Sequence, residues 1–346
     1  MSFNINTSYL IDCFKDIVNV PSPVGYYVKF KPVLNRYAES LGYTCSYDNR
    51  STGYITVEGE DSSKTVLVGA HADTIGAVVR GIDSDGTLLV RELGGINYSS
   101  IEGNTVTVHT RHGRDYTGLF ACKYHSVHIF EKARSETRDE TNTMVILDER
   151  VSSKEDVKAL GIQNGDFISF SPNTEITPNG YLKSRFIDNR GAIACVFEAI
   201  RYLNENNLKP KYNTIFAFPF DEETGLGGTY VPSEVSEYVA MDIGLIGPEH
   251  DGNEYSVSIC AKDAANPYDY DLTCRLIDYA KKAGCDYAVD VYKLYGTDGN
   301  AAQRGGNNVK SAAFGMAVTC SHSRERTHIT GLENTAKLLL AYLLDI

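Results

Sequence analysis

The sequence predicts an α/β protein in which helices flank a mixed sheet and a mostly β domain is inserted into the chain. Apolar runs of strand length end in polar residues, and stretches with apolar residues at helical spacing lie between these runs. From about Val79 to Asn173 the pattern changes to short alternating runs separated by Gly, Asp and Asn. The chain of 346 residues also exceeds the usual size of one hydrophobic core, which favours two domains or one domain with an insertion.

The first part of the chain, residues 1–78, is predicted to hold two helices followed by strands. The expected elements are an opening helix that ends near Pro21, a helix over 27–41, and strands over 43–47, 54–58 and 65–69. The last of these apolar runs leads directly into His71, Ala72 and Asp73. A buried strand that ends in polar residues carries them at its C-terminal end, which is where open α/β sheets bind ligands.

Residues 79–173 are predicted to form the inserted, mostly β domain. Its strand-like runs cover 87–90, 105–109, 144–147 and 167–170. Turn-rich stretches such as GIDSDGTLL and LGIQNGDFI accompany these runs. The charged segment KARSETRDETN, residues 132–142, is expected to be an exposed loop.

The α/β pattern resumes in residues 174–346, where Asp188 precedes a predicted amphipathic helix. The apolar face of this helix comprises Ile193, Val196, Phe197, Ile200 and Leu203. An apolar run that starts at Asn213 ends in the adjacent carboxylates Glu222 and Glu223. Neighbouring side chains of an extended segment point opposite ways, so one carboxylate is expected to bind a metal while the other faces substrate or water.

The rest of the chain adds two more polar residues in strand-like surroundings. Asp242 lies within the apolar run VAMDIGLI, and a buried unpaired carboxylate is costly. His322 directly follows an apolar run over 311–320. The other predicted elements are a helix over 268–283, a glycine-rich segment over 296–306 and a final helix over 331–344.

Five segments therefore deliver an imidazole or a carboxylate at or near a strand end. They are His71 with Asp73, Asp188, Glu222 with Glu223, Asp242, and His322. Imidazole and carboxylate ligands without a thiolate are typical of catalytic Zn, Co or Mn sites. The set is too large for one ion, whereas two ions that share a bridging Asp can polarise a carbonyl and activate water. A spare carboxylate is then needed to move the proton, and the Glu222–Glu223 pair provides it.

Each of these residues also has a simpler interpretation on its own. His71 could be a hydrogen-bonded core histidine, Asp188 could cap the helix that it precedes, and His322 could lie in a surface loop. An acidic turn that closes a strand would account for Glu222 and Glu223. Five such segments in the same strand-end context favour one shared site over five separate explanations.

Six segments carry a resemblance to a known family. They are GAHADTIGAVV, FIDNRGA, DEETGLGG, AMDIG, YGTDGNA and SHSRERTH. These segments resemble the motifs of the dinuclear-metal aminopeptidases, which include the glutamyl, deblocking and tetrahedral aminopeptidases. The resemblance covers nearly the whole chain and implies a catalytic metallopeptidase domain made of residues 1–78 and 174–346. It also implies that residues 79–173 form a β-rich oligomerisation domain.

The resemblance implies two divalent metal ions per subunit, with Zn expected and Co or Mn as alternatives. By this likeness His71 and Asp242 would bind one ion and Glu223 and His322 the other. Asp188 would bridge the two ions.

The same resemblance gives roles to Glu222 and Asp73. Glu222 would be the general base and acid, and Asp73 would hydrogen-bond to His71 and fix its tautomer. The implied function is a metal-dependent aminopeptidase that hydrolyses N-terminal residues from peptides through a dinuclear metal-bound water. Its partners would be peptides with a free N-terminus and further copies of the chain, in a homo-oligomer of up to a dodecamer.

Two departures from the family motifs leave alternatives open. Asp221 stands where the family usually has Gln, and its charge could raise the pKa of the base. His328 is an alternative to His322 as the last metal ligand, although His322 is the one that directly follows the apolar strand. Asp263 and Asp298 are candidates for holding the free amino terminus of a peptide.

The composition argues against several classes of protein. A net charge of -12 and a pI near 5.2 argue against nucleic acid and anionic membranes as partners. No apolar run approaches membrane-spanning length, the opening residues lack a secretion signal, and the eight Cys form no CxxC pair, which predicts a cytoplasmic protein. The alternatives to an aminopeptidase are a glycan hydrolase, which would leave His71 and His322 unexplained, and a catalytically silent metal-binding assembly protein.

Overall fold

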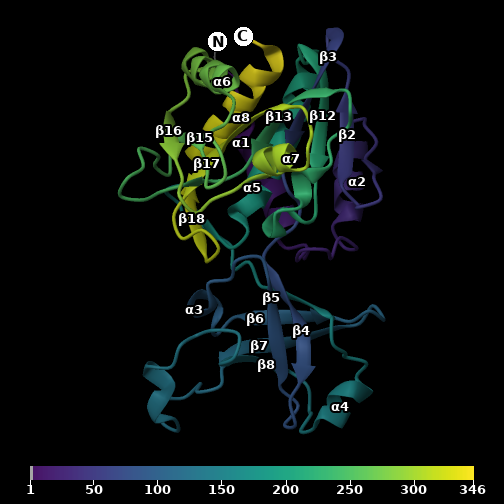
Figure 1. The fold of residues 1–346 in the computed structure, drawn as a ribbon, viewed down its shortest axis with the longest axis vertical. Helices are drawn as coiled ribbons and strands as arrows, with labels where there is room; N and C mark the ends of the chain where they lie inside the picture. Colours follow the sequence, from purple (N-terminus) through teal and green to yellow (C-terminus); the bar gives the residue numbers. More distant parts are fainter. Residues whose placement is uncertain (1–2) are drawn as a thin grey trace. The chain divides into compact units, whose positions relative to one another are not determined.

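The computed structural model describes residues 3–346 and divides into two compact units. The first unit runs to Asp73 and resumes at Asn173, and the second spans Thr74–Pro172. Figure 1 labels the helices and strands of both. The predicted fold class, a mixed sheet flanked by helices together with a mostly β insertion, is confirmed.

A nine-stranded mixed sheet forms the centre of the first unit (Figure 1). Its strands are β1 (Ser46–Tyr47), β2 (Gly53–Val57), β3 (Asp61–Gly69), β12 (Tyr212–Phe218), β13 (Val235–Met241), β14 (Gly244–Leu245), β15 (Val257–Lys262), β16 (Tyr287–Val291) and β17 (Lys310–Val318). They lie in the order β1–β2–β12–β3–β13–β17–β15–β16, with β14 paired to β17. Strands β12, β3, β13 and β17 are neighbours and run parallel, so their C-terminal ends meet at one edge of the sheet.

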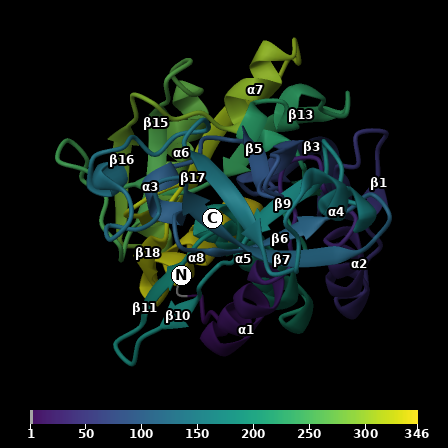
Figure 2. The same cartoon turned by 90° about the horizontal axis from the view of Figure 1, so that it is seen from below.

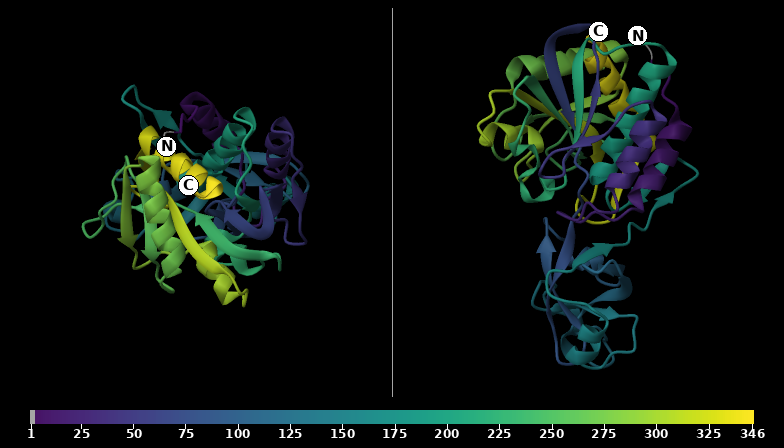
Figure 3. Two further views of the ribbon diagram at one scale, coloured as in Figure 1. Left: turned by 90° about the horizontal axis from the view of Figure 1, so that it is seen from above. Right: turned by 90° about the vertical axis from the view of Figure 1, so that its right-hand side faces the viewer.

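Helices pack against this sheet. They are α1 (Thr7–Val18), α2 (Lys31–Ser40), α5 (Ile187–Glu205), α6 (Tyr270–Ala283), α7 (Asp298–Arg304) and α8 (Ile329–Leu344). Helix α5 packs between α1 and α8, and these three helices lie side by side in Figure 3. The predicted apolar face of α5 is buried, and its Phe197 stacks on Phe218 of β12 with ring centroids 5.7 Å apart.

Helix α2 is shorter than the helix predicted over 27–41, because it begins at Lys31. Pro32 lies in its first turn. Proline has no backbone N–H to donate and clashes with the preceding turn in a helix interior, so it is tolerated at the start of a helix and not in the middle. The residues before Lys31 therefore form turns instead of helix.

A small second sheet in the first unit connects distant segments. Its strands are β10 (Glu175–Ile176), β11 (Tyr181–Ser184) and β18 (Glu325–His328). Strand β11 pairs antiparallel with β18, and Ser184 lies opposite Glu325. Because α5 follows β11 in the chain, this pairing brings the start of α5 beside the segment that follows β17.

The second unit is a closed antiparallel barrel, whose strands are labelled in Figures 1 and 2. Its strands are β4 (Gly76–Ile82), β5 (Leu88–Leu93), β6 (Thr105–His109), β7 (Asp115–Cys122), β8 (Thr143–Leu147) and β9 (Phe167–Phe170). They close in the order β4–β5–β8–β7–β6–β9, which leaves no strand edge exposed. Short helices α3 (Tyr98–Ile101) and α4 (Lys154–Ala159) and a 3₁₀ turn, η1 (Glu131–Arg134), lie in the connections. The barrel core is built from Val79, Val90, Val106, Val108, Phe120, Val145 and Ile168.

The described residues contain neither a disulfide nor a membrane-spanning helix. All eight cysteines are free thiols. Within residues 3–346, no helix combines the length and the apolar character that crossing a membrane requires.

Candidate metal centre

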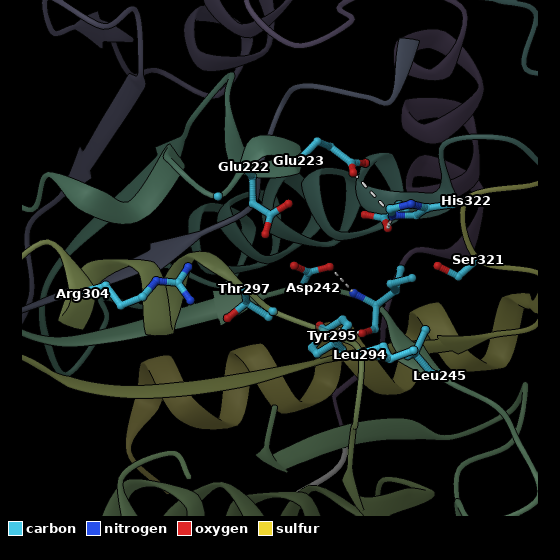
Figure 4. A pocket seen from close by; sticks show the side chains of 14 residues that line it. Glu222, Glu223, Asp242, Leu245, Leu294, Tyr295, Thr297, Arg304, Ser321 and His322 are labelled. Atoms are coloured by element: carbon cyan, nitrogen blue, oxygen red, sulfur yellow. Dashed lines mark hydrogen bonds and ion pairs between the residues drawn. The ribbon is translucent and has the colours of Figure 1, made fainter. Parts of the chain in front are cut away.

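Four parallel strands bring the predicted site residues to one edge of the sheet. His71 follows β3, Glu222 and Glu223 follow β12, Asp242 follows β13, and His322 follows β17. Since these strands are neighbours, the residues beyond their C-terminal ends lie close together. Figure 4 shows the side chains of Glu222, Glu223, Asp242 and His322 around a common space.

Asp188 reaches the same edge from the start of α5. Its backbone is not helical, with φ -73° and ψ 100°, and the N-cap residue of the helix is Phe186, which makes no side-chain cap. The partners of the Asp188 side chain are two histidines, which a helix-capping role alone does not explain. Its Oδ1 lies 2.9 Å from Nε2 of His71 and its Oδ2 lies 3.6 Å from Nε2 of His322, so the carboxylate directs one oxygen toward each histidine.

Two groups of side chains at this edge are compact enough to hold a metal ion. One consists of His71, Glu222 and Asp242, and the other of His71, Asp188 and Glu223, with the ligand atoms of each group within 4.8 Å of one another. His322 adjoins the second group, because its Nε2 lies 3.4 Å from a carboxylate oxygen of Glu223. These nitrogen and oxygen donors are the ligands that Zn, Co and Mn accept.

The carboxylates at this edge carry more negative charge than the two histidines neutralise. Burial raises the pKa of Glu222 well above its usual value, although the nearby His71 opposes this. Burial and the charge of Asp188 raise the pKa of Glu223 to about 7. The same two causes raise the pKa of Asp242 well above its usual value. Like charges this close in a buried site are costly, and divalent cations would relieve them, so the residues fit such ions.

Asp188 differs from the other carboxylates in its protonation. Burial alone would raise its pKa, but hydrogen bonds from His322 and His71 hold the pKa below its usual range. In the opposite sense, burial alone would lower the pKa of His71, whereas Glu222 and Asp188 raise it. The carboxylate between the two histidines is thus the one that stays ionised most readily.

The turn that carries Glu222 and Glu223 is anchored by Asp73. Glu222–Thr224 is a 3₁₀ turn, so the expectation of an extended segment with opposed side chains is wrong. The backbone N–H groups of Glu222 and Glu223 donate to the Asp73 carboxylate over 3.2 and 3.0 Å, and these bonds hold the turn. The same carboxylate lies 3.4 Å from Nδ1 of His71. One buried residue therefore orients a histidine and the carboxylate pair together.

The carboxylates form one wall of a cavity of about 440 Å³, a volume within the range of small-molecule sites. Both Glu222 and Glu223 line it. Its other lining side chains include the apolar group Ile243, Leu245, Leu294 and Tyr295, and the guanidinium of Arg304. Arg304 and Leu294 lie on different sides of the acidic groups in Figure 4.

A family model for M42 glutamyl aminopeptidases matches residues 52–338, a range that includes every residue of this strand-end group. The chain belongs to the M42 glutamyl aminopeptidase family. It is therefore a hydrolase of the peptidase class, and the resemblance inferred from its motifs is confirmed.

Relatives of this M42 peptidase span the same length. "Putative aminopeptidase YhfE" of Bacillus subtilis (strain 168) is 39% identical over 337 residues, which are 96% of each chain. The Pyrococcus horikoshii TET1 peptidase, which can assemble into a tetrahedron or a large octahedral shell, is 25% identical with a TM-score of 0.85 over 97% of this chain and 100% of that one. Aminopeptidase APDkam598 of Desulfurococcus kamchatkensis shares the fold at 21% identity, with a TM-score of 0.88 over 98% and 96% of the two chains.

Sequence reasoning missed the contribution of Glu325 to this site. Glu325 is buried, and its carboxylate accepts the backbone N–H of Asp188 at 3.0 Å and that of His322 at 3.2 Å. Its position on β18, opposite Ser184, places it between these two segments. The only signal in the sequence is a Glu that closely follows His322 in SHSRERTH.

His328, the alternative to His322, has other partners. It is the N-cap of α8, where its ring accepts the N–H of Thr330. Its Nε2 lies 2.8 Å from the carbonyl oxygen of Asn179, and its ring packs edge-on against Tyr181. The structure therefore brings His322, and not His328, to the strand-end carboxylates.

Asp263 and Asp298, the candidates for holding a substrate amino terminus, are not among the residues that line the cavity. Both are buried. Asp263 accepts the backbone N–H of Ala265 at 2.7 Å, and Asp298 accepts that of Gly228 at 2.6 Å, so each carboxylate holds a loop. Asp298 still adds to the negative charge that raises the pKa of Glu222.

Asp221, which replaces the Gln usual in the family, is paired in this structure. It forms an ion pair with Arg50, which also donates to the carbonyl oxygen of Leu226 at 2.7 Å and to Oγ1 of Thr229 at 2.6 Å. The expected effect of Asp221 on the general base is therefore offset by Arg50. Besides burial, the carboxylates that raise the pKa of Glu222 are Asp242, Asp298 and Glu223.

Proposed function

We propose that this M42 peptidase is a metal-dependent aminopeptidase that removes the N-terminal residue from peptides, with Glu222 as general base. One observation carries the proposal: buried and half-buried carboxylates from distant parts of the chain surround two histidines and form the wall of a cavity. Such an excess of negative charge suits divalent cations, and such a cavity suits the end of a small substrate.

Two divalent ions would be held by the strand-end residues. His71 and Asp242 would hold one, Glu223 and His322 the other, and Asp188 both. This division is supported by the carboxylate of Asp188, which directs one oxygen toward each histidine. When bound, such a pair of ions supplies a Lewis acid for the scissile carbonyl and lowers the pKa of water. Zn is the first expectation, and Co and Mn accept the same ligands.

Glu222 is the carboxylate left to move a proton. It would take the proton from the attacking water and deliver it to the leaving amine. Its position on the cavity wall supports this role, and burial raises its pKa, which makes the carboxylate a stronger base than an ordinary Glu. Because Glu222 also lies within reach of His71 and Asp242, the competing assignment is a metal ligand.

The two assignments of Glu222 differ in a measurable way. Glu222→Gln keeps the shape of the side chain and removes its ability to accept a proton. If Glu222 is the base, hydrolysis of leucine p-nitroanilide falls sharply while bound metal, measured by elemental analysis, stays at the wild-type level. If Glu222 is instead a ligand, metal content falls together with activity. Glu149→Gln, an exposed substitution in the second unit, is the matched control and should change neither quantity.

The proposal as a whole requires a metal-dependent exopeptidase. Hydrolysis of leucine and alanine p-nitroanilides should disappear after dialysis against a chelator and return on addition of Zn, Co or Mn. Turnover that survives both chelation and Glu222→Gln would rule the mechanism out. Bound metal without turnover on any N-terminal residue would instead favour the catalytically silent alternative.

Assembly is a second part of the proposal. The Pyrococcus horikoshii relative assembles into a tetrahedron or an octahedral shell, and by analogy we propose a homo-oligomer for this chain, with the second unit supplying contacts between copies. Light scattering of the purified protein tests this, and a monomeric mass at micromolar concentration would contradict it.

A further inference from the structure

The cavity beside the candidate metal centre has a single strongly basic side chain. Arg304 is the only Arg or Lys among its lining residues in the part of the chain that the structure describes. The neighbouring wall carries the carboxylates of Glu222, Glu223, Asp242 and Asp188. An arginine in such a place either neutralises one of these carboxylates or remains available to a ligand.

Arg304 does not neutralise any carboxylate of the described chain. Within residues 3–346 its guanidinium makes no hydrogen bond and no ion pair. Asp221, which stands where the family usually has Gln, is already paired with Arg50. Other arginines of the first unit have defined partners: Arg190 donates to the carbonyl oxygen of Ala72, and Arg275 pairs with Glu237.

The backbone that carries Arg304 is held in place although its side chain is exposed. Arg304 is the last residue of α7, and the next residue, Gly305, packs so closely on Thr229 that a Cβ would overlap the Thr229 carbonyl oxygen. Nη2 of Arg304 lies 3.9 Å from where a Cβ on Gly225 would be. Gly225 ends the turn that carries Glu222 and Glu223, so the guanidinium lies beside the carboxylate pair. Figure 4 shows Arg304 extended toward the same space as Thr297 and Glu222.

Given the proposed function, the charges that line the cavity indicate which kind of ligand group Arg304 can bind. The four carboxylates that line the cavity would balance two divalent ions, and Arg304 adds one positive charge at one side of this lining. A planar guanidinium with free donors binds carboxylates through paired, charge-assisted hydrogen bonds. The opposite side of the cavity offers Leu245 and Leu294, which suit an apolar group.

We propose that Arg304 is a specificity-determining residue that recognises a carboxylate of the peptide substrate near the scissile bond. Two sources share this chemistry: the side chain of an acidic N-terminal residue, and the free C-terminal carboxylate of a dipeptide. In either case an acidic substrate gains binding energy that its neutral analogue lacks.

Two substrate pairs separate the sources. Glutamate and leucine p-nitroanilides differ only in the N-terminal side chain, and Leu-Ala and Leu-Ala-amide differ only in the C-terminal carboxylate. In Arg304→Gln, kcat/KM for the acidic member of one pair should fall about 10- to 100-fold relative to the neutral member, as expected for a charge-assisted hydrogen bond. Arg304→Lys should retain part of the preference, and Arg36→Gln, an exposed arginine on α2, should retain all of it.

A binding measurement keeps this inference separate from the proposed function. In the Glu222→Gln background, calorimetry gives the dissociation constants of Glu-Ala-amide, Leu-Ala and Leu-Ala-amide with and without Arg304→Gln. Loss of affinity confined to one acidic peptide supports the proposal and identifies the source of the carboxylate. The proposal would be overturned if the acidic-to-neutral ratios of kcat/KM and of the dissociation constant agreed within about twofold with and without Arg304→Gln. The absence of binding by all three peptides would also overturn it. Failure of turnover alone would count only against the proposed function.

Discussion

Two buried histidines, one in each unit, have different surroundings. His71 in the first unit and His109 in the second are both almost fully buried, and each has a carboxylate beside its ring. Nδ1 of His109 lies 2.9 Å from Asp115 and its Nε2 lies 2.8 Å from Oγ of Ser169. This Ser–His–Asp chain has the order of a catalytic triad, whereas the side chains that face the ring of His71 are the carboxylates of Asp73, Asp188 and Glu222.

The two sites differ in the number of carboxylates near the histidine and in the parts of the chain that supply them. His109, Asp115 and Ser169 are on three neighbouring strands of one barrel, and His109 is paired in register with Asp115. The imidazole there faces the Asp115 carboxylate on one side and Ser169, only 8% exposed, on the other. Around His71, carboxylates from four separate segments gather at the end of a sheet and beside a cavity. An unbalanced buried charge, more than a His–acid pair, therefore indicates a reactive site.

Metal removal should give the largest effect that separates the two histidines. Chelation should abolish peptide hydrolysis, because the carboxylates around His71 lose the cations that balance them. The barrel around His109 should keep its structure, which circular dichroism can follow in the same sample. If activity were unchanged after exhaustive chelation, metal dependence would not distinguish His71 from His109, and the comparison would be wrong.

Glu222→Gln should have the next largest effect. A lost general base lowers kcat by about 10²- to 10⁴-fold. Asp115→Asn removes the carboxylate beside His109 and is the corresponding change in the second unit; it should leave kcat within about twofold. Steady-state kinetics on leucine p-nitroanilide compares the two variants directly, and an equal loss in both would contradict the comparison.

Glu325→Gln tests the support behind the site. The substitution keeps one acceptor oxygen but removes the charge that receives the N–H groups of Asp188 and His322. Loss of such a supporting contact lowers metal affinity by about 10- to 100-fold. Zinc titration of the metal-free protein measures this, and Glu325→Asp should recover part of the affinity. Unaltered affinity in Glu325→Gln would show that the contact is only structural.

His109→Phe should change stability without changing the chemistry. It breaks the hydrogen bonds to Asp115 and Ser169 in the barrel, at a cost of about 1–3 kcal/mol in the free energy of unfolding. The kcat per folded molecule should equal that of the wild type. Thermal unfolding and kinetics on the same preparation test this, and a fall in kcat would give the barrel a catalytic role.

The smallest effect should come from Arg50→Met. The variant leaves Asp221 unpaired beside the carboxylate turn, but both partners are partly exposed, at 34% and 24% of their side chains. Partly solvated ion pairs contribute at most about 1 kcal/mol. Asp221→Asn in the same chain should restore the part of the loss that comes from the unpaired carboxylate, and denaturant unfolding of the three variants would show whether it does.

The sequence was informative where one local pattern decides the outcome. Each of the runs before His71, Asp242 and His322 is apolar and ends in a polar residue, so strand ends could be placed without knowing the sheet order. The amphipathic face of α5, which includes Phe197, follows from helical spacing in the same way.

Features that depend on distant segments could not be predicted. The 3₁₀ turn at Glu222 is held by Asp73, which lies far away in the chain. The role of Glu325 depends on the register of β18 against β11. The pairing of Asp221 with Arg50 joins two segments that are far apart in the chain. Local spacing contains no information about any of these three contacts.

The most direct test of the metal centre is its stoichiometry. Metal-free protein titrated with zinc should bind two ions per chain, and turnover of leucine p-nitroanilide should rise with occupancy. Asp188→Asn removes the negative charge of the residue between the two histidines. This variant should bind fewer ions and lose turnover in parallel. Full turnover by protein with fewer than about one metal ion per ten chains would contradict the account.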